Sequence, residues 1–302
     1  MKSPTIYFKH SLQISQLIVV IFLFASTACP TFGQAVNKKK LTIDDYSKWS
    51  TLYTPIISND GQWAAFTLRY QGIADSLVVM NIQTQKIMKY KHAIEYEFSP
   101  NSNWIYNFEP DRTLKLINLS SKEVKNFPDM ELFYYSDKGD YAGVLDKNDI
   151  FSLIDLETEK TSRWEAVKWF EFAPDGTWVA VSFDKNGKNS IELVDTQSLQ
   201  KYVILKSNDG TFSNLVWNSQ GTGLAFMESK LDTIHNLSYT LLYEFRNSPL
   251  PKLRSLHPEG QMGFPHNTYM DTQSKMFYAA DGERIFFYVR PKNYLKRNLD
   301  SI

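Results

Sequence analysis

The sequence contains almost no cysteine, since its 302 residues include only Cys29. One thiol cannot form an intramolecular disulfide, and thiolate metal sites need several cysteines. An excess of charge of one sign is also missing, because 33 basic and 33 acidic residues balance to a formal net charge of zero. Binding to a nucleic acid requires a basic face, so the charge gives no reason to expect such a partner.

A long apolar run is absent as well. The most apolar segment of the N-terminus, LIVVIFLFA at residues 17–25, has nine residues, whereas a bilayer-spanning helix needs about 20. Lys2 and Lys9 precede the run, and small residues follow it as far as Gly33. This order is typical of a cleaved signal peptide. We therefore predict a signal peptide over residues 1–34 and a secreted or periplasmic protein without a membrane span.

Cys29 lies inside that segment and offers an alternative, a lipid anchor that would make the chain a lipoprotein. A bacterial lipobox has an aliphatic residue three positions before its cysteine, and Ser26 stands there. If cleavage follows Gly33, the mature chain has no thiol, and its stability rests on packing alone.

Most of the remaining sequence repeats one pattern, in which a polar turn is followed by a short apolar strand. Aromatic residues make up 15% of the chain, which favours strands. The pattern occurs six times: ISNDGQWAAF (57–66), FSPNSNWIYN (98–107), YSDKGDYAGV (135–144), FAPDGTWVAV (172–181), WNSQGTGLAF (217–226) and YAADGERIFF (278–287). Its turn residues are Gly61, Ser102, Gly139, Gly176, Gly221 and Gly282, spaced by 41, 37, 37, 45 and 61 residues. Glycine suits such a turn because it adopts a left-handed conformation at little cost.

A second marker follows the first four turns and keeps nearly the same period. It reads MNIQT (80–84), INLSS (117–121), IDLET (154–158) and VDTQS (194–198). Its Asn or Asp ends a strand, where the side chain can accept a hydrogen bond from a nearby backbone amide. Two independent markers with one period indicate a true structural repeat.

Each unit therefore provides about four short strands in roughly 40 residues, the length of a propeller blade. A single four-stranded sheet cannot bury its faces, whereas neighbouring sheets in a radial array cover one another. We predict an all-β fold, a β-propeller of six or more four-stranded blades over residues 56–302, with the last blade incomplete. A β-sandwich is the alternative, but it would not explain the period. Residues 35–55 form an N-terminal segment, in which LTIDDYSKWSTL (41–52) predicts at least one helical turn capped by Thr42.

Four segments together resemble one protein family: LTIDDYSKW (41–49), ISNDGQWAAFTLRY (57–70), EGQMGFP (259–265) and DGERIFFYVRP (281–291). The chain is similar, over residues 41–292, to the N-terminal half of secreted bacterial serine peptidases of the prolyl oligopeptidase family, including acylaminoacyl-peptidase-like members. The resemblance implies a propeller that precedes an α/β-hydrolase domain and covers its active site.

The sequence departs from that family where the chemistry would take place. The hydrolase nucleophile sits in a Gly-x-Ser-x-Gly turn, and none of the 13 glycines has a serine two residues later. No catalytic residue can therefore be carried over, and we expect no catalytic, cofactor-binding or metal-binding residue in this chain. The partner would be a peptide, or an α/β-hydrolase domain present elsewhere.

Two polar groups are candidate metal sites. His257, Glu259 and His266 share one loop, but their spacing lacks the pattern of a metal-binding helix. The second group, in hairpin loops, offers oxygen ligands without an EF-hand pattern, and turn formation is the simpler role of its members Asp146, Asn148, Asp184 and Asn186.

Two further groups could face a ligand. One consists of aromatic residues at a single position of successive units, which inter-blade packing explains better than ligand binding; these are Trp63, Trp104, Tyr141 and Trp178. The other consists of Arg69 and Arg290, which follow the first and last blade-start strands. They could present charge to a peptide carboxylate, although a solvated strand end is the simpler interpretation.

Three functional hypotheses follow. The first is the non-catalytic, substrate-gating propeller of a prolyl oligopeptidase-like peptidase, whose narrow opening admits short peptides. The second is a free-standing periplasmic propeller that binds a protein, peptide or glycan, and it requires a closed ring because open sheet edges favour association. The third, an active site on the propeller itself, lacks a nucleophile with a positioned base.

Overall fold

A computed structural model describes residues 40, 42, 45, 49–70, 73–91, 93–232, 237–246, 251–257 and 261–291. The chain divides into two units, Met1–Tyr46 and Ser47–Ile302. In the first unit Asp45 is helical, and its carboxylate accepts hydrogen bonds from the backbone nitrogen and the hydroxyl of Thr42 at 3.1 and 3.0 Å. This is one half of a capping box, at the predicted position. The predicted signal peptide and Cys29 lie outside the described residues.

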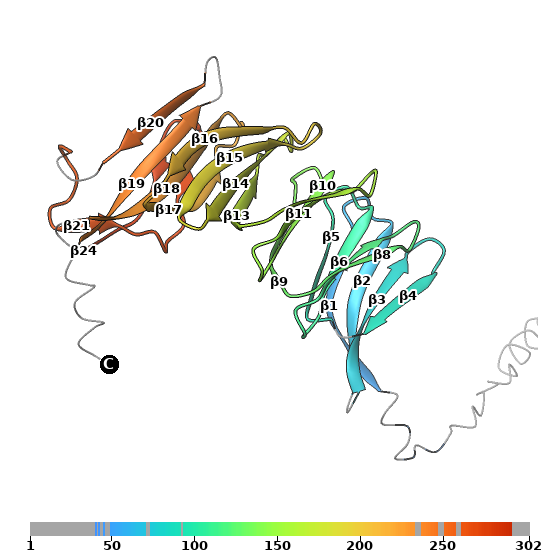
Figure 1. The fold of residues 1–302 in the computed structure, drawn as a ribbon. Helices are drawn as coiled ribbons and strands as arrows, with labels where there is room; N and C mark the ends of the chain where they lie inside the picture. Colours follow the sequence, from blue (N-terminus) through green and yellow to red (C-terminus); the bar gives the residue numbers. More distant parts are fainter. Residues whose placement is uncertain are drawn as a thin grey trace, which may run out of the picture. The chain divides into compact units, whose positions relative to one another are not determined.

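The second unit is a β-propeller, as the repeat predicts, and its described residues form five four-stranded antiparallel sheets and a sixth, smaller unit (Figure 1). Sheets 1 and 2 consist of β1 (Ser50–Ile57), β2 (Trp63–Tyr70), β3 (Ile73–Asn81), β4 (Ile87–Lys91), β5 (Glu95–Phe98), β6 (Trp104–Phe108), β7 (Leu114–Asn118) and β8 (Val124–Phe127). Sheet 3 consists of β9 (Met130–Tyr135), β10 (Tyr141–Asp146), β11 (Phe151–Asp155) and β12 (Thr161–Trp164). Sheets 4 and 5 consist of β13 (Val167–Phe172), β14 (Trp178–Lys185), β15 (Lys188–Asp195), β16 (Lys201–Ser207), β17 (Gly210–Trp217), β18 (Gly223–Asp232), β19 (Leu237–Arg246) and β20 (Lys252–Leu256).

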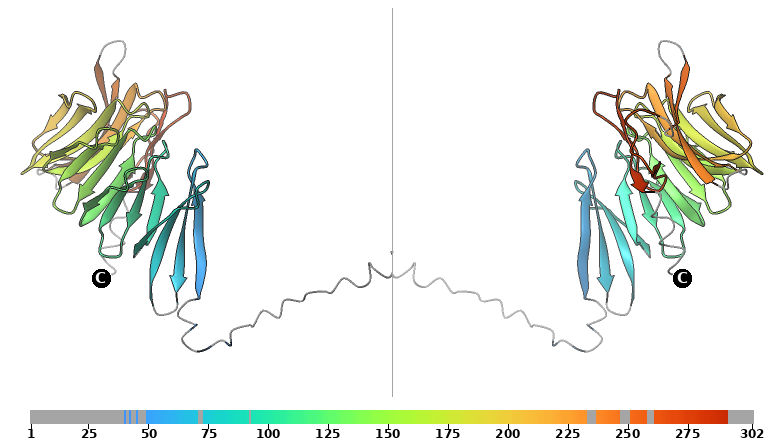
Figure 2. Two further views of the ribbon diagram at one scale, coloured as in Figure 1. Left: turned by 90° about the vertical axis from the view of Figure 1, so that its right-hand side faces the viewer. Right: turned by 90° about the vertical axis from the view of Figure 1, so that its left-hand side faces the viewer.

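Strands within each of these five sheets pair in the order of the sequence, which Figure 2 shows clearly for the blue to cyan strands of sheet 1. The first strand of that sheet begins at Ser50, where Ser50 pairs with Tyr70. This is earlier than residue 56, at which the sequence predicts that the propeller begins. Sheet 6 contains two short pairs, β21 (Thr268–Met270) with β24 (Val289–Pro291) and β22 (Phe277–Tyr278) with β23 (Ile285–Phe286).

The repeated turns have one geometry in all six units. Each turn residue is in the left-handed region, from Ser102 at φ 62° to Gly139 and Gly176 at φ 76°. The turn residue donates its backbone N–H to the carbonyl three residues earlier, as from Gly61 to Ser58, at 2.8–3.0 Å in all six units. The turn chemistry predicted from the sequence is therefore confirmed, including the unit in which serine replaces glycine.

The second marker also has the predicted role. The side-chain oxygen of Asp155 accepts hydrogen bonds from the backbone N–H groups of Glu157 and Thr158, both at 2.9 Å. Asn81, Asn118 and Asp195 make the same kind of contact in their own sheets. These side chains close the turn between the third and fourth strands.

Successive turns also contact one another. The side-chain nitrogen of Asn59 donates to the carbonyl of Pro100 at 3.0 Å, and that of Asn101 donates to the carbonyl of Gly139 at 2.6 Å. A Cβ atom on Gly139 would lie 2.7 Å from the backbone nitrogen of Asn101, whereas one on Gly61 would meet nothing within 4 Å. Gly139 in the turn of sheet 3 is thus packed against sheet 2, while Gly61 in the turn of sheet 1 has open space around it.

This difference gives a matched prediction. Gly61→Ala should cost about 1 kcal/mol of unfolding free energy, because alanine is strained at positive φ. Gly139→Ala should cost roughly 3 kcal/mol, because steric overlap with Asn101 adds to the same strain. Urea denaturation of both variants measures the difference, and equal losses would show that the turns of sheets 2 and 3 are not in contact.

The hydrophobic core is divided among the five junctions between successive sheets. Sheets 1 and 2 bury Ala65, Val79 and Ile105 together, and sheets 3 and 4 bury Phe151 and Phe170 together. Equivalent clusters join sheets 2 and 3, sheets 4 and 5, and sheets 5 and 6. Each sheet therefore covers its neighbour, which is how a chain of short strands obtains a core without disulfides.

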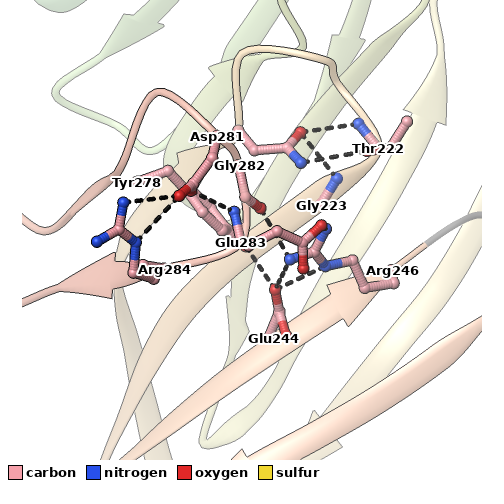
Figure 3. Close-up of polar contacts among 10 residues, drawn as sticks. Thr222, Gly223, Glu244, Arg246, Tyr278, Asp281, Gly282, Glu283 and Arg284 are labelled. Carbon is pink, nitrogen blue, oxygen red and sulfur yellow. Dashed lines mark hydrogen bonds and ion pairs between the residues drawn. The ribbon is translucent and has the colours of Figure 1, made fainter.

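Sheet 6 is fixed to sheet 5 by a polar network as well (Figure 3). Arg246 of β19 donates from Nη2 to the carbonyl of the turn residue Gly282 at 2.8 Å and forms an ion pair with Glu244 at 2.6 Å. The hydroxyl of Tyr278 donates to the same Glu244 carboxylate at 3.4 Å. Arg246 thereby links the turn of one sheet to the third strand of the preceding sheet.

Candidate functional site

Strands of neighbouring sheets meet close to Glu171. Strand β13 contacts β10 of sheet 3 and β17 of sheet 5, and β17 contacts β22 of sheet 6. The backbone carbonyl of Glu171 accepts a hydrogen bond from the indole nitrogen of Trp217 at 3.2 Å. We take Glu171 and the residues that influence it as the candidate functional site.

The pKa of the Glu171 carboxyl is well above its ordinary value. Burial raises its pKa from 4.5 to about 7, while a hydrogen bond from Trp169 and the charge of Lys275 act in the opposite direction. Asp137 raises the pKa further. Asp137 belongs to the turn of sheet 3 and Lys275 to sheet 6, so charges from two other sheets act on one carboxyl of sheet 4.

Two exposed aromatic rings belong to the same site. Trp169 of β13 is 39% exposed, and Tyr134 of β9 is 41% exposed. The ring of Tyr134 packs edge-on against Phe170, with 5.8 Å between centroids. Burial, and after it the charge of Glu171, raises the pKa of the Tyr134 hydroxyl.

The groups of this site are suited to bind a ligand. Exposed aromatic rings offer flat apolar surfaces. A carboxyl that titrates near pH 7 donates a hydrogen bond when neutral and attracts a cationic group when ionised. A perturbed pKa of this kind is a recognised marker of functional positions.

Glu171 also makes stability depend on pH. Because its pKa in the folded chain is about 7 and its ordinary value is 4.5, the folded state binds more protons than the unfolded state between these values. The unfolding free energy contributed by this group is therefore highest below pH 4.5, falls as the pH rises, and stays low above pH 7.

The Glu171→Gln variant should lack this dependence. We expect it to match the wild type near pH 4.5 and to exceed it by roughly 2 kcal/mol at pH 8, because partial contact with solvent reduces the full effect of the shift. Urea denaturation at both pH values tests this. A variant less stable than the wild type at pH 8 would show that the carboxylate is stabilised rather than strained by its surroundings.

Other cavities lined by described residues lie elsewhere on the propeller. One of them, of about 420 Å³, is lined by turn residues of sheets 3 and 4 that include Asp140, Asp155, Asp175 and Asp195. At least three of these carboxylates already accept backbone hydrogen bonds within their own turns. They therefore serve as parts of the fold.

The second cavity, about 350 Å³, lies between sheets 2 and 3 and is lined by Glu95, Tyr106, Arg112 and Phe133 among others. The Tyr106 hydroxyl donates to Glu95 at 2.8 Å, and Arg112 donates to the carbonyl of Met130 at 2.9 Å. Its polar groups are thus engaged with one another or with the backbone.

The predicted packing role of the repeated aromatic residues is confirmed. Trp104 is 1% exposed, and its indole nitrogen donates to the carbonyl of Leu156 in sheet 3 at 3.0 Å. Trp63, Tyr141 and Trp178 pack against the clusters at other junctions. None of the four lines either cavity described above except Tyr141, at the rim of the larger one.

The candidate metal residues have other contacts. The ring of His257 lies 5.5 Å from that of Tyr239, while Glu259 lies outside the described residues. Asp146 accepts the backbone N–H groups of Asn148 and Ile150 at 2.8 and 3.0 Å. Asp184 likewise accepts that of Gly187, and Asn186 occupies the left-handed turn position before it. In the part of the chain that the structure describes, no three His, Cys, Asp or Glu side chains converge in a way that could hold a metal ion.

The interpretation of a solvated strand end is wrong for Arg290, which is engaged within the fold, whereas Arg69 is exposed near the end of β2 as that interpretation expects. Arg290 donates to the buried Asp271 at 2.6 Å, and the guanidinium of Arg69 lies 4.6 Å from the ring centre of Tyr53. Burial acts to raise the pKa of Asp271, but hydrogen bonds from Ser274 and Arg290 outweigh it and lower the pKa. A buried carboxylate is costly unless a charged partner compensates it, and Arg290 is that partner.

Sequence reasoning did not single out Glu171. The position five residues before the turn holds apolar Ile56, Val216 and Phe277 in three other units, but it holds Glu97 in sheet 2. A charged residue at this position therefore does not single out Glu171. The pKa of Glu171 also depends on residues of other sheets that no local pattern reveals.

No family model and no curated protein matches the chain. Similar solved structures include Kuenenia stuttgartiensis hydrazine synthase, with 15% identity over 82% of this chain and 78% of that chain and a TM-score of 0.45. Another is oligogalacturonate lyase from Vibrio parahaemolyticus, with 12% identity over 80% and 75% and a TM-score of 0.43. A third is the β-propeller domain of Cps50 (Swd1) from Myceliophteria thermophila, with 13% identity over 72% and 79% and a TM-score of 0.36.

These TM-scores are all below 0.5 and carry no argument about this chain, so membership of the prolyl oligopeptidase family stays a prediction. The described part of the chain contains no helix of the length and apolarity needed to cross a membrane. The described sheets of the chain are by themselves those of a β-propeller.

Proposed function

We propose that the chain is a secreted or periplasmic, non-catalytic propeller that binds short peptides, as the substrate-gating portion of a prolyl oligopeptidase-like serine peptidase. Its own sequence has no Gly-x-Ser-x-Gly turn, so hydrolysis would require an α/β-hydrolase domain. In this role the propeller selects peptides by size and by their contacts with its strands.

The observation that carries the proposal is the proximity of Glu171 to exposed Trp169 and Tyr134, on the first strands of sheets 4 and 3. A short peptide offers an N-terminal ammonium and apolar side chains, which match an ionised carboxylate and aromatic surfaces. Because the Glu171 pKa is about 7, the attraction for the ammonium should increase as the pH rises from 5.5 to 7.5.

Peptide binding tests this directly. We expect short peptides with a free N-terminus to bind the full chain several-fold more tightly at pH 7.5 than at pH 5.5, as measured by calorimetry. The Glu171→Gln variant should lose this pH dependence, while Glu157→Gln, a change in an exposed loop, should keep it. Equal binding by the wild type at both pH values would exclude Glu171 as the recognising group.

Catalysis is tested separately. The purified chain should neither cleave chromogenic dipeptide substrates nor react with a fluorophosphonate probe of serine nucleophiles. Either activity would overturn the non-catalytic role. The coding sequence directly downstream of codon 302 is also informative, because a continuation that encodes Gly-x-Ser-x-Gly would supply the missing catalytic part.

Exposed aromatic rings also suit the apolar faces of sugars, so a glycan is the second candidate ligand. A glycan carries no ammonium, and its binding should therefore not increase between pH 5.5 and 7.5. Parallel titration with neutral oligosaccharides distinguishes the two ligands.

A further inference from the structure

The five junctions between sheets are built from the same two faces each time. We call the face that a sheet turns toward the preceding sheet its front face, and the face toward the following sheet its rear face. The residue four positions before each turn residue lies on the front face, as Phe98 and Phe172 do. The residue four positions after it lies on the rear face, as Ala65 and Ala180 do.

The front face of sheet 1 is the one front face in the described chain that no sheet covers. Phe98, Phe172 and Trp217 are 8–9% exposed at the front position, but Ile57 is 66% exposed at the same position of sheet 1. Ile57 pairs with Ala64, Ala64 with Met80 and Met80 with Ile87, so these residues share one face. Leu52 and Ile87, which are 50% and 53% exposed, extend this apolar surface.

The rear face of sheet 6 is likewise an exposed apolar face. At the rear position Ala65, Ala180 and Ala225 are fully buried and Tyr106 is 8% exposed, whereas Phe286 is 45% exposed. The ring of Phe286 stacks on that of Phe277, with 5.2 Å between centroids. Phe277 and Tyr288 are 48% and 56% exposed and continue the apolar surface.

We propose that the front face of sheet 1 binds the rear face of sheet 6 of a second copy of this chain. Each of the five internal junctions joins one rear face to one front face. The two exposed faces have apolar residues at the same positions, so they can form a junction of the same kind. Each copy carries one face of each kind, so a second copy joined front to rear supplies one missing partner, and further copies can add to the two faces that remain free. The formal net charge is zero, and copies therefore do not repel one another through their overall charge.

Such an interface is heterologous, because two different faces meet. A single charged substitution on either face should therefore prevent a variant from associating with itself. Two variants with opposite defects should nevertheless bind each other once, through the one intact face that each retains.

Sedimentation of the full chain tests this. We expect the mass of the wild type to rise with concentration, and Ile57→Asp and Phe286→Asp to remain monomeric with at least tenfold weaker self-association. An equimolar mixture of the two variants should form a heterodimer and no larger species. Leu199→Asp, at an exposed hairpin turn of sheet 4, is the control and should associate like the wild type.

Three results would overturn the proposal. A wild type that stays monomeric at high concentration would show that the end faces do not bind a second copy. Self-association of Ile57→Asp alone would show that like faces meet. A mixture that stays monomeric, although both variants keep the circular dichroism spectrum of the wild type, would show that the two faces do not match.

Discussion

The Gly143→Val variant is expected to lose roughly 3–5 kcal/mol of unfolding free energy, although valine favours strands more than glycine does. A Cβ atom at Gly143 of β10 would overlap Cε2 of Phe170 and would lie 2.8 Å from its Cζ and 3.1 Å from Cε2 of Phe151. Phe170 belongs to sheet 4 and is fully buried. Gly143 therefore lets the ring of one sheet reach the backbone of the preceding one.

A second-site variant makes the origin of this loss testable. Phe170→Leu removes ring atoms from the overlap and should recover part of the stability that Gly143→Val loses, so that the two changes are not additive. Denaturant unfolding of the single and double variants measures the coupling. Additive losses, or a Gly143→Val variant within 1 kcal/mol of the wild type, would contradict the packing of sheet 3 on sheet 4.

Trp104→Ala is expected to cost about 3–5 kcal/mol, because it removes a large buried side chain at the junction of sheets 2 and 3. It also leaves the Leu156 carbonyl without the indole donor at 3.0 Å. Trp104→Phe keeps most of the burial and should cost about 1–2 kcal/mol. Thermal or urea unfolding measures both values.

Trp178 provides the matched control for this prediction. It occupies the same position of sheet 4, but it is only partly buried, against Tyr202 of its own sheet at 5.3 Å between centroids. Trp178→Ala should therefore cost clearly less than Trp104→Ala. Equal costs would contradict the prediction that the deeper burial of Trp104 and its hydrogen bond to sheet 3 add stability.

The repeated elements of this fold were predictable because their determinants are local. A glycine after a polar residue sets a left-handed turn, and the period of these turns sets the number of units. Ser102 shows the strength of the pattern, since it adopts φ 62° although it is not glycine. The packing of Trp104 between units follows from the same repetition.

The remaining features were not predictable because they depend on contacts between sheets. The pKa of Glu171 results from burial, from a hydrogen bond with the nearby Trp169, and from the charges of Lys275 and Asp137, which lie far away in the sequence. Arg290 was expected at a solvated strand end, but it pairs with the buried Asp271, which lies 19 residues earlier in the sequence. Gly143 has no positive φ, and its need for a small side chain arises only from the Phe170 ring.

The central claim, that successive units form sheets packed front to rear, is tested most directly by a crystal structure of the chain. Our account predicts strands paired in sequence order within each sheet, with the indole nitrogen of Trp104 on the Leu156 carbonyl and that of Trp217 on the Glu171 carbonyl. A sandwich in which strands of different units pair with one another, without these two hydrogen bonds, would contradict it.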